Sequence, residues 1–571
     1  MRRGVGGRWW DVPVSVVLVC ADPARPGTVL LCAAPDTASV VDQGMGPARE
    51  VPRAELAAVV AAVEEAEHPR WVWDDTERWY PGLLVAGVRL RRAHDLRLCH
   101  AILRRSTRTV GTRFAAGPRS AWDETEPGAQ VHAPSLFDEL EPRDAGLPDP
   151  AGELRAQLAC LVESEDDGRL RLLLAAESTG ALIAAELRHD GLPWRADLHD
   201  ALLTELLGPR PPEGVRPAKL QALAETIAAA LERPGLNPDS PPELLRALRS
   251  AGIDVATTRK WELRAHDHPV IEPLLAYKKL SRLLTANGWA WMERWATGGR
   301  FRPDYVPAGV VTGRWASNGG GALQLPAGIR AAVRADPGHV LVVADAAQLE
   351  PRVLAAMSGD RAMAAAGRQA DLYQAVVQAG IVGDRQQAKY AMLGAIYGAT
   401  TGASAVLMPQ LARGYPRAVD LVERAARAGE RGEQVTTWLG RSSPLPSADR
   451  RAEKLAAGGE GGDESTARDA RRHARDWGRF TRNFIVQGTA AEWALCWMAV
   501  LRQRLIGLPG RPHLVFFLHD ELMVHSPVDQ AEGVAAAVRE SAVEAGRLLF
   551  GDTPVEFALD LAVVDSYDQA G

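Results

Sequence analysis

The chain has 571 residues, of which 46% are apolar and 24% charged, and its formal net charge is −6. This length predicts three or four domains, and the composition is that of a soluble globular protein. No run of eighteen or more apolar residues occurs, which argues against a membrane-spanning helix, and the acidic balance counts against nucleic-acid binding. The five cysteines are scattered without zinc-ligand spacing, as expected for reduced thiols in the cytoplasm.

Residues 1–115 predict a small α/β domain. Apolar runs such as "VSVVLVC" and "TVLLCAAP" alternate with a helical stretch from Glu55 to Glu67. The basic and then apolar N-terminus has some features of a signal peptide, but it contains Pro and Ser and lacks a small-residue cleavage site, so we predict an ordinary first strand. Residues 116–152 are rich in Pro, Gly and acidic side chains and predict a linker.

From about residue 153 to residue 300, apolar residues recur at helical spacing, and one helix is expected to begin at Pro241 and Pro242. Residues 440–466 are rich in Ser, Pro, Gly and mixed charge, which predicts a mobile surface loop. Between Thr466 and Arg482 there are six arginines and two aspartates. Such a local basic strip can contact phosphates although the whole chain is acidic.

Two apolar runs, "HVLVVADAAQLEPR" from His339 and "LVFFLHDELMVHSP" from Leu514, each stop at a carboxylate and predict buried strands. The carboxylates are Asp345 in the first run and Asp520, followed by Glu521, in the second. If the strands are neighbours in one sheet, these side chains form an oxygen-rich site for Mg²⁺, and a pair of such ions is a recurring device for phosphoryl transfer. Taken singly, either aspartate could instead cap a turn or helix.

A helix is expected from Asp384, with Arg385, Lys389, Leu393 and Tyr397 spaced four residues apart on one stripe. Two cations beside a metal site would suit a triphosphate, because Arg binds phosphate in a planar bidentate manner and Lys acts as a point charge. The alternative is a solvated basic face with a packed tyrosine.

The two strand motifs, together with "DRQQAKYAMLGAIYG", "VTGRWASNGGGALQLP" and "RFTRNFIVQGTAAE", resemble the motifs of family A DNA polymerases and occur in the family's order over roughly residues 300–571. The resemblance implies a multi-domain α/β fold, in which an RNase H-like exonuclease domain precedes a right-hand polymerase with a helical thumb, an antiparallel-sheet palm and helical fingers. The implied divisions are 1–152 for a degenerate 3′–5′ exonuclease-like domain with its linker, 153–300 for the thumb, 301–357 and 491–571 for the two parts of the palm, and 358–490 for the fingers.

The resemblance also implies roles for individual residues. Asp345 and Asp520 would be the metal ligands, and Glu521 would be a secondary catalytic carboxylate. The residues implied in binding the incoming nucleotide are Arg385, Lys389, Leu393, Tyr397, Glu350, Gln348 and Tyr373, and Glu350 among them would crowd the sugar 2′ position. Those implied in contacting primer and template are Arg314, Arg352, Arg479, Asn483, Gln487 and His519, although His519 could equally be a turn histidine.

The first third of the chain resembles the family's 3′–5′ exonuclease domain, mainly over "RWVWDDTERWYPGLLVAGVRLRRAHDLRLCHAIL". Active members hold two metal ions with about four carboxylates from three motifs. Here Asp75 and Glu77 are the only candidates in a promising arrangement, so we predict a vestigial nuclease.

The expected function is therefore template-directed extension of a primed DNA template with dNTPs, using two Mg²⁺ ions that Mn²⁺ could replace and without proofreading. We expect a cytoplasmic, nucleoid-associated monomer that does not bind membranes. One alternative is an active bifunctional 3′–5′ exonuclease and DNA polymerase. Another is a non-catalytic protein that binds primed DNA, because Ala346, Ala347 and Leu393 depart from the family's motifs.

Overall fold

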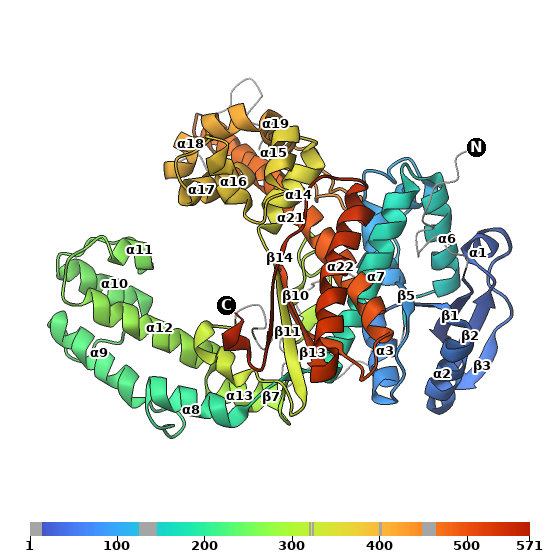
Figure 1. Cartoon of the computed structure of the whole chain (residues 1–571), viewed down its shortest axis with the longest axis horizontal. Helices are drawn as coiled ribbons and strands as arrows, with labels where there is room; N and C mark the ends of the chain where they lie inside the picture. Colours follow the sequence, from blue (N-terminus) through green and yellow to red (C-terminus); the bar gives the residue numbers. More distant parts are fainter. Residues whose placement is uncertain are drawn as a thin grey trace. The chain divides into compact units, whose positions relative to one another are not determined.

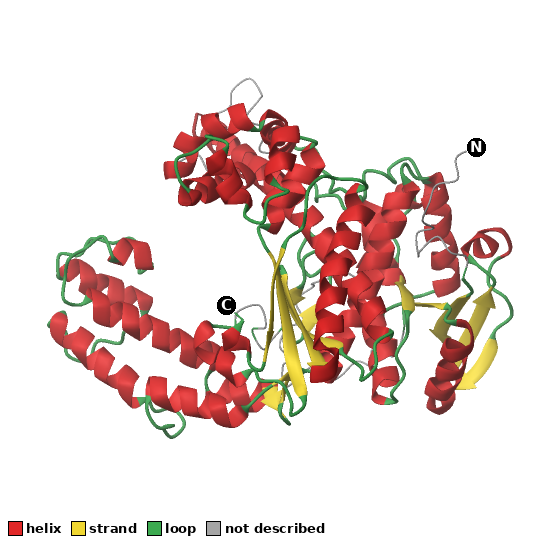
Figure 2. Ribbon diagram, in the orientation of Figure 1, coloured by secondary structure: helices red, strands yellow, loops and turns green. Residues whose placement is uncertain are grey.

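The computed structural model describes residues 14–124, 146–318, 321, 325–398, 402–447 and 464–570. The chain divides into two compact units (Figure 1). The first contains residues 1–190, 304–318 and 342–563, and the second contains residues 191–303, 319–341 and 564–571. Helices and strands occur in both units, so the expected mixed α/β class is confirmed (Figure 2).

The first unit begins with a five-stranded sheet in the order β3-β2-β1-β4-β5. Strands β1, β4 and β5 are parallel, whereas β1–β2 and β2–β3 are antiparallel pairs. Trp71, Trp73 and Tyr80 are fully buried in the core of this sheet. The elements of this region are β1 (Val16–Ala21), β2 (Thr28–Ala34), α1 (Thr37–Gln43), β3 (Arg49–Pro52), α2 (Leu56–Glu67), β4 (Arg70–Trp73), α3 (Thr76–Val85), β5 (Arg92–Asp95), α4 (Leu96–Arg105), α5 (Arg113–Ala116), α6 (Pro150–Glu163) and α7 (Asp167–Asp190).

The rest of the first unit is built around a four-stranded sheet in the order β12-β13-β11-β14. Its strands are β11 (His339–Ala346), β12 (His513–Leu518), β13 (Glu521–Pro527) and β14 (Leu559–Val564), and two short strands, β9 (Tyr305–Val306) and β10 (Ala316–Ser317), pair separately. The accompanying helices are α14 (Leu349–Ser358), α15 (Arg361–Ala366), α16 (Leu372–Gln378), α17 (Arg385–Tyr397), α18 (Gly402–Gly414), α19 (Pro416–Arg431), α21 (Glu464–Ile506) and α22 (Ala531–Phe550). Helices α7, α21 and α22 pack against one another or against this sheet.

The second unit is mainly helical. Its elements are β6 (Leu192–Pro193), α8 (Ala196–Leu207), α9 (Ala218–Ala230), α10 (Pro241–Ser250), α11 (Lys260–Leu263), α12 (Ile271–Asn287), α13 (Trp289–Trp295), β7 (Ala296–Thr297) and β8 (Arg300–Phe301). Leu203, Ile227 and Leu274 are fully buried in its core. Helix α10 begins at Pro241, as the sequence predicts.

The helical unit begins at Gly191, later than the expected boundary at residue 153. The reason is that α6 and α7 pack on other parts of the first unit. Helix α6 contacts α4 and α1, and α7 contacts α3, β5 and α21. Residues 153–190 therefore belong to the first unit.

The expected mobile loop at 440–466 is partly wrong. Residues 448–463 lie outside the described residues, but Ser442 and Ser443 are buried and the segment just before them is ordered by hydrogen bonds. The Ser106 hydroxyl donates to the Gly440 carbonyl at 2.6 Å, and the Thr107 backbone N–H donates to the Ser442 hydroxyl at 2.9 Å. Local composition could not reveal these contacts because their partners are more than 300 positions away.

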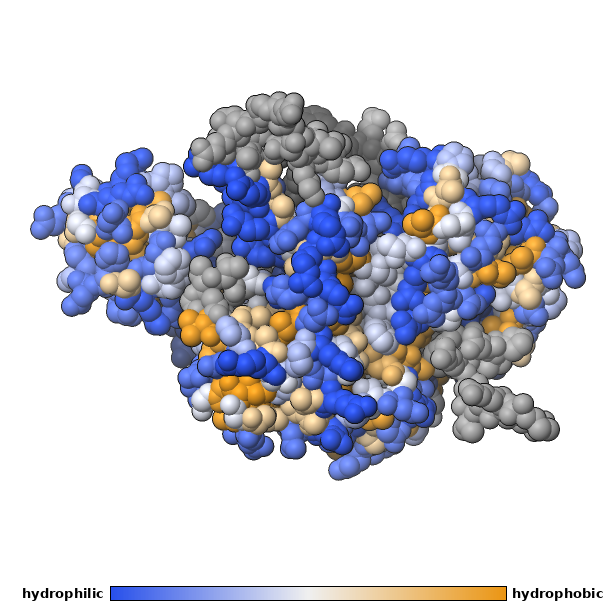
Figure 3. All heavy atoms as spheres, turned by 90° about the horizontal axis from the view of Figure 1, so that it is seen from above, coloured by the Kyte–Doolittle hydropathy of each residue, from blue (hydrophilic) through white to orange (hydrophobic). Residues whose placement is uncertain are grey.

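Helix α21 contains an apolar stretch long enough to cross a membrane by length and composition, within Arg468–Ile506. However, 89% of that stretch is buried inside the protein, which is typical of a core helix. Trp493 and Trp497 of α21 are fully buried, and Trp493 stacks on Phe557 with 4.9 Å between ring centroids. On the face shown in Figure 3, hydrophilic side chains predominate and apolar ones form small separate groups.

Candidate active site

Asp345 and Asp520 lie at adjoining positions of the four-stranded sheet. Strands β11 and β13 are neighbours, and the backbone N–H of Ala346 donates to the carbonyl of Asp520 at 2.9 Å. Asp520 follows β12 in a tight turn, because Leu518 pairs with Glu521 across the hairpin. The structure thus brings together the two carboxylates that the apolar runs predicted to meet, and Glu521 lies beside them as the first residue of β13.

The electrostatics of this pair favour a bound cation. Burial raises the pKa of Asp345 to about 6, with further contributions from the negative charges of Asp520 and Asp560. Burial also raises the pKa of Asp520, with Glu350 and Glu521 contributing. Two partly buried carboxylates whose ionised forms are disfavoured by burial and by neighbouring negative charge form a donor set that suits a divalent cation.

Within the described residues, no group of three or more His, Cys, Asp or Glu side chains could hold a metal ion. A divalent cation at Asp345 and Asp520 would therefore need oxygen ligands from water or from substrate phosphates, as is usual for Mg²⁺. Such a site fits a metal that binds together with a phosphorylated substrate.

The raised pKa of Asp345 predicts a pH-dependent stability in metal-free buffer. The folded-state pKa of about 6 lies above the usual value of 3.8, so the carboxyl destabilises the folded state fully above pH 6, and this cost falls gradually to zero between pH 6 and pH 3.8. We expect Asp345→Asn to raise the thermal midpoint of the metal-free protein at pH 7.5 and to raise it by a smaller amount at pH 5, which lies between the usual pKa and the folded-state pKa. Differential scanning calorimetry with EDTA at both pH values measures the difference.

The matched control for this experiment is Asp552→Asn, because Asp552 is exposed in the segment after α22. It should leave both midpoints nearly unchanged. Adding Mg²⁺ at pH 7.5 should then stabilise the wild type more than Asp345→Asn. Equal midpoints of wild type and Asp345→Asn at pH 7.5 without metal would contradict the electrostatic account.

Glu350, on the first turn of α14, connects two of the predicted substrate-binding residues. One of its carboxylate oxygens accepts from the Arg314 guanidinium, and the other accepts from the Tyr397 hydroxyl at 2.6 Å. Burial, the hydrogen bond to Glu350 and the charge of Glu350 together raise the pKa of Tyr397 above its usual range, and Gln487 also hydrogen-bonds this hydroxyl. Side chains from four different segments of the chain are thus tied together at one point.

A second cluster is organised by Asp371, the N-cap of α16. Its carboxylate accepts from Gln348 at 3.0 Å and from Arg385 at 2.6 Å. The Arg385 guanidinium also lies 5.6 Å from the ring centroid of Tyr373, which is buried. Arg385, Gln348 and Tyr373, three of the predicted nucleotide-binding residues, are therefore brought together.

The other two predicted nucleotide-binding residues lie on α17, which Asp384 caps by accepting from the Gln387 N–H at 2.8 Å. Lys389 is exposed, and its ammonium forms no ion pair with any described residue. Leu393, one turn further on, is half-buried. Both therefore remain on the stripe that the four-residue spacing predicts.

The prediction that Arg352 contacts DNA is wrong in this structure. The Arg352 side chain is fully buried, and its five N–H groups donate to backbone carbonyls. The distances are between 2.6 and 2.9 Å, and the acceptors are Ala347, Gly367, Gln369, Ala370 and Glu556. No donor remains for a phosphate, so Arg352 holds the loops around α14 together.

The remaining predicted DNA-binding residues have different environments. Arg479 is exposed on α21 and forms an ion pair with Asp476. Asn483 and Gln487 follow on the same helix and are half-buried. His519 precedes Asp520 with a left-handed φ of 57°, and burial lowers its pKa, with the positive charge of Arg314 contributing.

Asp75 and Glu77, the two weak candidates for an exonuclease site, interact with neighbouring protein groups. Asp75 caps α3 by accepting from the Glu77 N–H at 3.1 Å, and it forms an ion pair with Arg97 at 3.1 Å. Burial raises the pKa of Glu77, whose nearest described cation is Arg188 at 3.7 Å. The adjacent Asp74 accepts from Arg78 and from the Trp79 indole, each at 2.6 Å. These contacts account for the carboxylates after β4 without a metal.

Sequence reasoning missed Asp371 and Asp560. Asp371 precedes "LYQAVV" and so has the position of a helix N-cap, but its ties to Gln348 and Arg385 depend on tertiary structure. Asp560 is on β14, and only the strand order beside β11 brings its charge near Asp345.

The profile of DNA polymerase family A matches residues 219–568 of this chain. The chain is 28% identical over 352 residues to the DNA polymerase I of Chloroflexus aurantiacus, covering 57% of this chain and 35% of that protein. It is 26% identical over 324 residues to the thermostable DNA polymerase I of Thermus thermophilus, covering 52% and 36%. A DNA polymerase of Mycobacterium phage D29 is 28% identical over 300 residues, covering 48% and 44%.

A solved structure with a similar fold is the POL domain of Pol1 from M. smegmatis, in complex with DNA primer-template and dNTP. The TM-score is 0.67 at 19% sequence identity, and the match covers 98% of this chain and 96% of that chain. Because the family profile covers more than half of the sequence, the chain belongs to DNA polymerase family A. The matched regions span about a third of the length of the first two curated relatives.

Proposed function

We propose that this chain is a DNA-directed DNA polymerase that extends a primed template with dNTPs. The observation that carries the proposal is the meeting of Asp345 and Asp520 on neighbouring strands in a member of DNA polymerase family A. The experiment that tests it is primer extension by the purified protein with Mg²⁺ and the four dNTPs. A protein that binds primed DNA without extending it would refute catalysis and favour the non-catalytic alternative.

In the proposed reaction the primer 3′-hydroxyl attacks the α-phosphate of the dNTP in line, and pyrophosphate leaves. Asp345 and Asp520 would hold Mg²⁺, which supplies charge neutralisation to the attacking and leaving oxygens when it is bound. Arg385 and Lys389 would hold the outer phosphates and neutralise charge that builds on the pyrophosphate. Because Arg385 is paired with Asp371, an incoming triphosphate would compete for this guanidinium.

We further propose that the family's right-hand layout applies to this chain, with the four-stranded sheet as the palm and α14–α19 as the fingers. The second unit, beginning at Gly191, would be the thumb. Exposed cations on α21, Arg479 among them, would contact the phosphates of primer or template.

Glu350 is the residue we expect to exclude ribonucleotides. Glu350→Ala should increase incorporation of ribonucleotides relative to deoxynucleotides by about tenfold or more. The reason is that a change of about 1.4 kcal/mol in the discrimination free energy corresponds to a factor of ten. Single-nucleotide primer extension with rNTP and dNTP measures the ratio.

Glu350→Gln is the matched control, because it keeps the size of the side chain and removes the charge that pairs with Arg314. If bulk excludes the 2′-hydroxyl, Glu350→Gln should retain most of the discrimination. An equal increase in both variants would assign discrimination to the ion pair, and no increase in either would show that another residue excludes the sugar hydroxyl.

We propose that the protein lacks proofreading. The wild type should not shorten a mismatched, single-stranded 3′ end with Mg²⁺ or Mn²⁺, because the carboxylates after β4 are engaged in a helix cap and ion pairs. The Asp75→Ala, Glu77→Ala double variant should keep its polymerase activity and lose about 1 kcal/mol of stability with the α3 cap.

Degradation of the mismatched end by the wild type, but not by that double variant, would establish a working exonuclease. The first third of the chain would then support the bifunctional alternative.

A further inference from the structure

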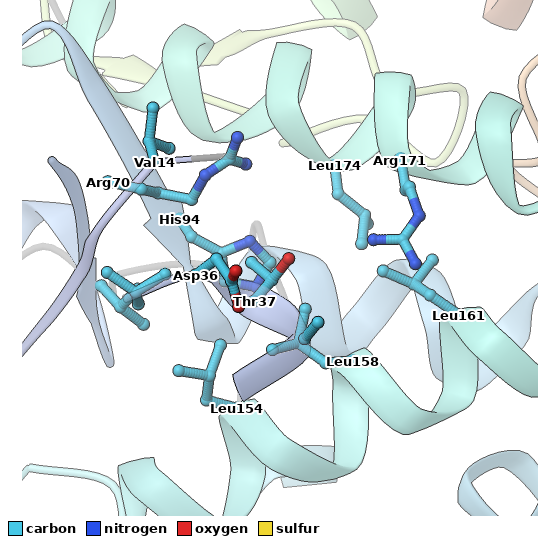
Figure 4. Close-up of a pocket in the computed structure, with 13 residues that line it drawn as sticks. Val14, Asp36, Thr37, Arg70, His94, Leu154, Leu158, Leu161, Arg171 and Leu174 are labelled. Atoms are coloured by element: carbon cyan, nitrogen blue, oxygen red, sulfur yellow. The ribbon is translucent and has the colours of Figure 1, made fainter. Parts of the chain in front are cut away.

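A cavity of about 310 Å³ lies in the N-terminal part of the first unit (Figure 4). Its lining includes Val16 and Arg70, the first residues of the parallel strands β1 and β4, together with residues from α1, α6 and α7. Asp75, one of the two nuclease candidates, follows the last residue of β4, and neither it nor Glu77 lines the cavity. The proposed polymerase chemistry does not use the cavity either.

Arg70 is a cation without a counterion in this cavity. The Nε of Arg70 is buried and has no hydrogen-bond partner among the described residues. The Arg70 guanidinium forms no ion pair with any of these residues. Burial lowers its pKa to about 10, with the neighbouring positive charge of Arg92 contributing. Arg70 is half-buried, so an anion in the cavity could accept from its unpartnered Nε and gain a charge-assisted hydrogen bond.

A second guanidinium faces the same cavity. Arg171 of α7 is 29% exposed, and its Nε pairs with Asp167 at 3.1 Å. In the view of Figure 4 the guanidinium groups of Arg70 and Arg171 lie apart, with the side chain of Leu174 between them and His94, Asp36 and Thr37 below Arg70. An oxyanion between two arginines could accept several charge-assisted hydrogen bonds.

The other polar groups of the cavity do not neutralise these cations. Asp36 is the lining carboxylate, and its Oδ1 accepts from the N–H and hydroxyl of Ser39 as the N-cap of α1. His94 is neutral, because burial lowers its pKa to about 4, and its Nε2 lies 2.9 Å from the Gln157 amide oxygen. Because Arg171 is paired with Asp167, Arg70 is the cation of the cavity without an ion pair among the described residues, and it could balance one monoanion.

The rest of the wall is aliphatic. It is formed by Val14, Val72, Leu154, Leu158, Leu161 and Leu174. Apart from His94, no lining residue has an aromatic ring on which a base could stack. The volume is at the lower end of the range of about 300–1,000 Å³ for small-molecule sites.

We propose that this cavity binds an aliphatic carboxylate of medium chain length, with its carboxylate between Arg70 and Arg171 and its hydrocarbon chain against the leucines of α6 and α7. Arginine matches the planar geometry of a carboxylate in a bidentate manner. The leucine and valine side chains would cover the hydrocarbon body and remove it from water.

Isothermal titration calorimetry of the full-length protein with four probes tests the proposal. The probes are octanoate, octanol, inorganic phosphate and deoxyadenosine monophosphate. Octanol tests the need for the negative charge, inorganic phosphate tests the need for the aliphatic chain, and deoxyadenosine monophosphate tests a phosphate ester. Octanoate should bind at least about tenfold more tightly than each of the other three. Absence of octanoate binding, or tighter binding of either phosphate probe, would overturn the proposal.

Variants locate the site. Arg70→Met should weaken octanoate binding by about tenfold or more, and it should raise the thermal midpoint of the ligand-free protein because a half-buried cation without an ion pair is removed. Leu158→Trp should fill the cavity and abolish binding while Arg70 remains. Arg113→Met, at an arginine that is 89% exposed outside the cavity, should bind octanoate like the wild type.

A lower midpoint for Arg70→Met would assign the arginine a structural role and overturn the proposal. Unchanged octanoate affinity in both Arg70→Met and Leu158→Trp would also overturn it, because the ligand would then bind elsewhere. These measurements do not depend on polymerase activity, so failure of the proposed function would leave the outcome unaffected.

Discussion

Asp345→Asn and Asp520→Asn should each abolish primer extension while binding of primed DNA survives. Each substitution removes one carboxylate from the adjoining pair on β11 and the β12–β13 turn, so any divalent ion there would lose a charged ligand. Charge that stabilises the transition state contributes little to ground-state binding of the duplex. Loss of one preorganised electrostatic contact costs roughly 10²–10³ in rate, and we expect loss of a metal ligand to cost at least as much.

Single-turnover extension of a labelled primer, with DNA affinity measured by fluorescence anisotropy, separates the two effects. Asp552→Asn is a control of the same chemistry at an exposed position and should extend the primer at the wild-type rate. Near-normal extension by either active-site variant would remove that carboxylate from the proposed mechanism. A parallel loss of DNA affinity would indicate that the substitution disturbs the fold or the duplex contact instead.

Arg352→Ala should strongly destabilise the protein. The buried guanidinium satisfies five backbone carbonyls from the loops around α14 and from Glu556. Removal of a partner from a buried charged network costs roughly 3–5 kcal/mol, and each buried acceptor left without a donor adds to the cost. We expect the free energy of unfolding of this region to fall by at least about 3 kcal/mol, measured by urea denaturation followed by tryptophan fluorescence and circular dichroism.

Arg352→Lys tests whether geometry or charge matters, because an ammonium group offers three donors and cannot reach five carbonyls arranged around a planar fork. It should recover only part of the lost stability. Arg361→Ala, at an exposed position on the neighbouring helix α15, should leave stability nearly unchanged. A stable Arg352→Ala variant with weakened DNA binding would restore the interpretation of Arg352 as a DNA contact.

The local sequence determined the two strands and the helix that carry the residues of the proposed polymerase reaction. The apolar runs before Asp345 and Asp520 form buried strands because a continuous β-branched and aromatic segment is stable only when covered on both faces. The four-residue spacing after Asp384 likewise became α17, with Asp384 as its N-cap. In each case the signal lies within one element, where periodicity and capping operate over a few residues.

Tertiary structure alone decided which polar side chains are free for a substrate. Arg352 and Arg385 are one residue type in two sequence motifs, yet the first is buried among carbonyls and the second is exposed beside Asp371. The affiliation of α7 with the first unit and the burial of Ser443 also depend on partners far away in the chain. Composition and spacing cannot predict such contacts, because the free energy of burying a charged or polar group depends on which distant groups hydrogen-bond to it.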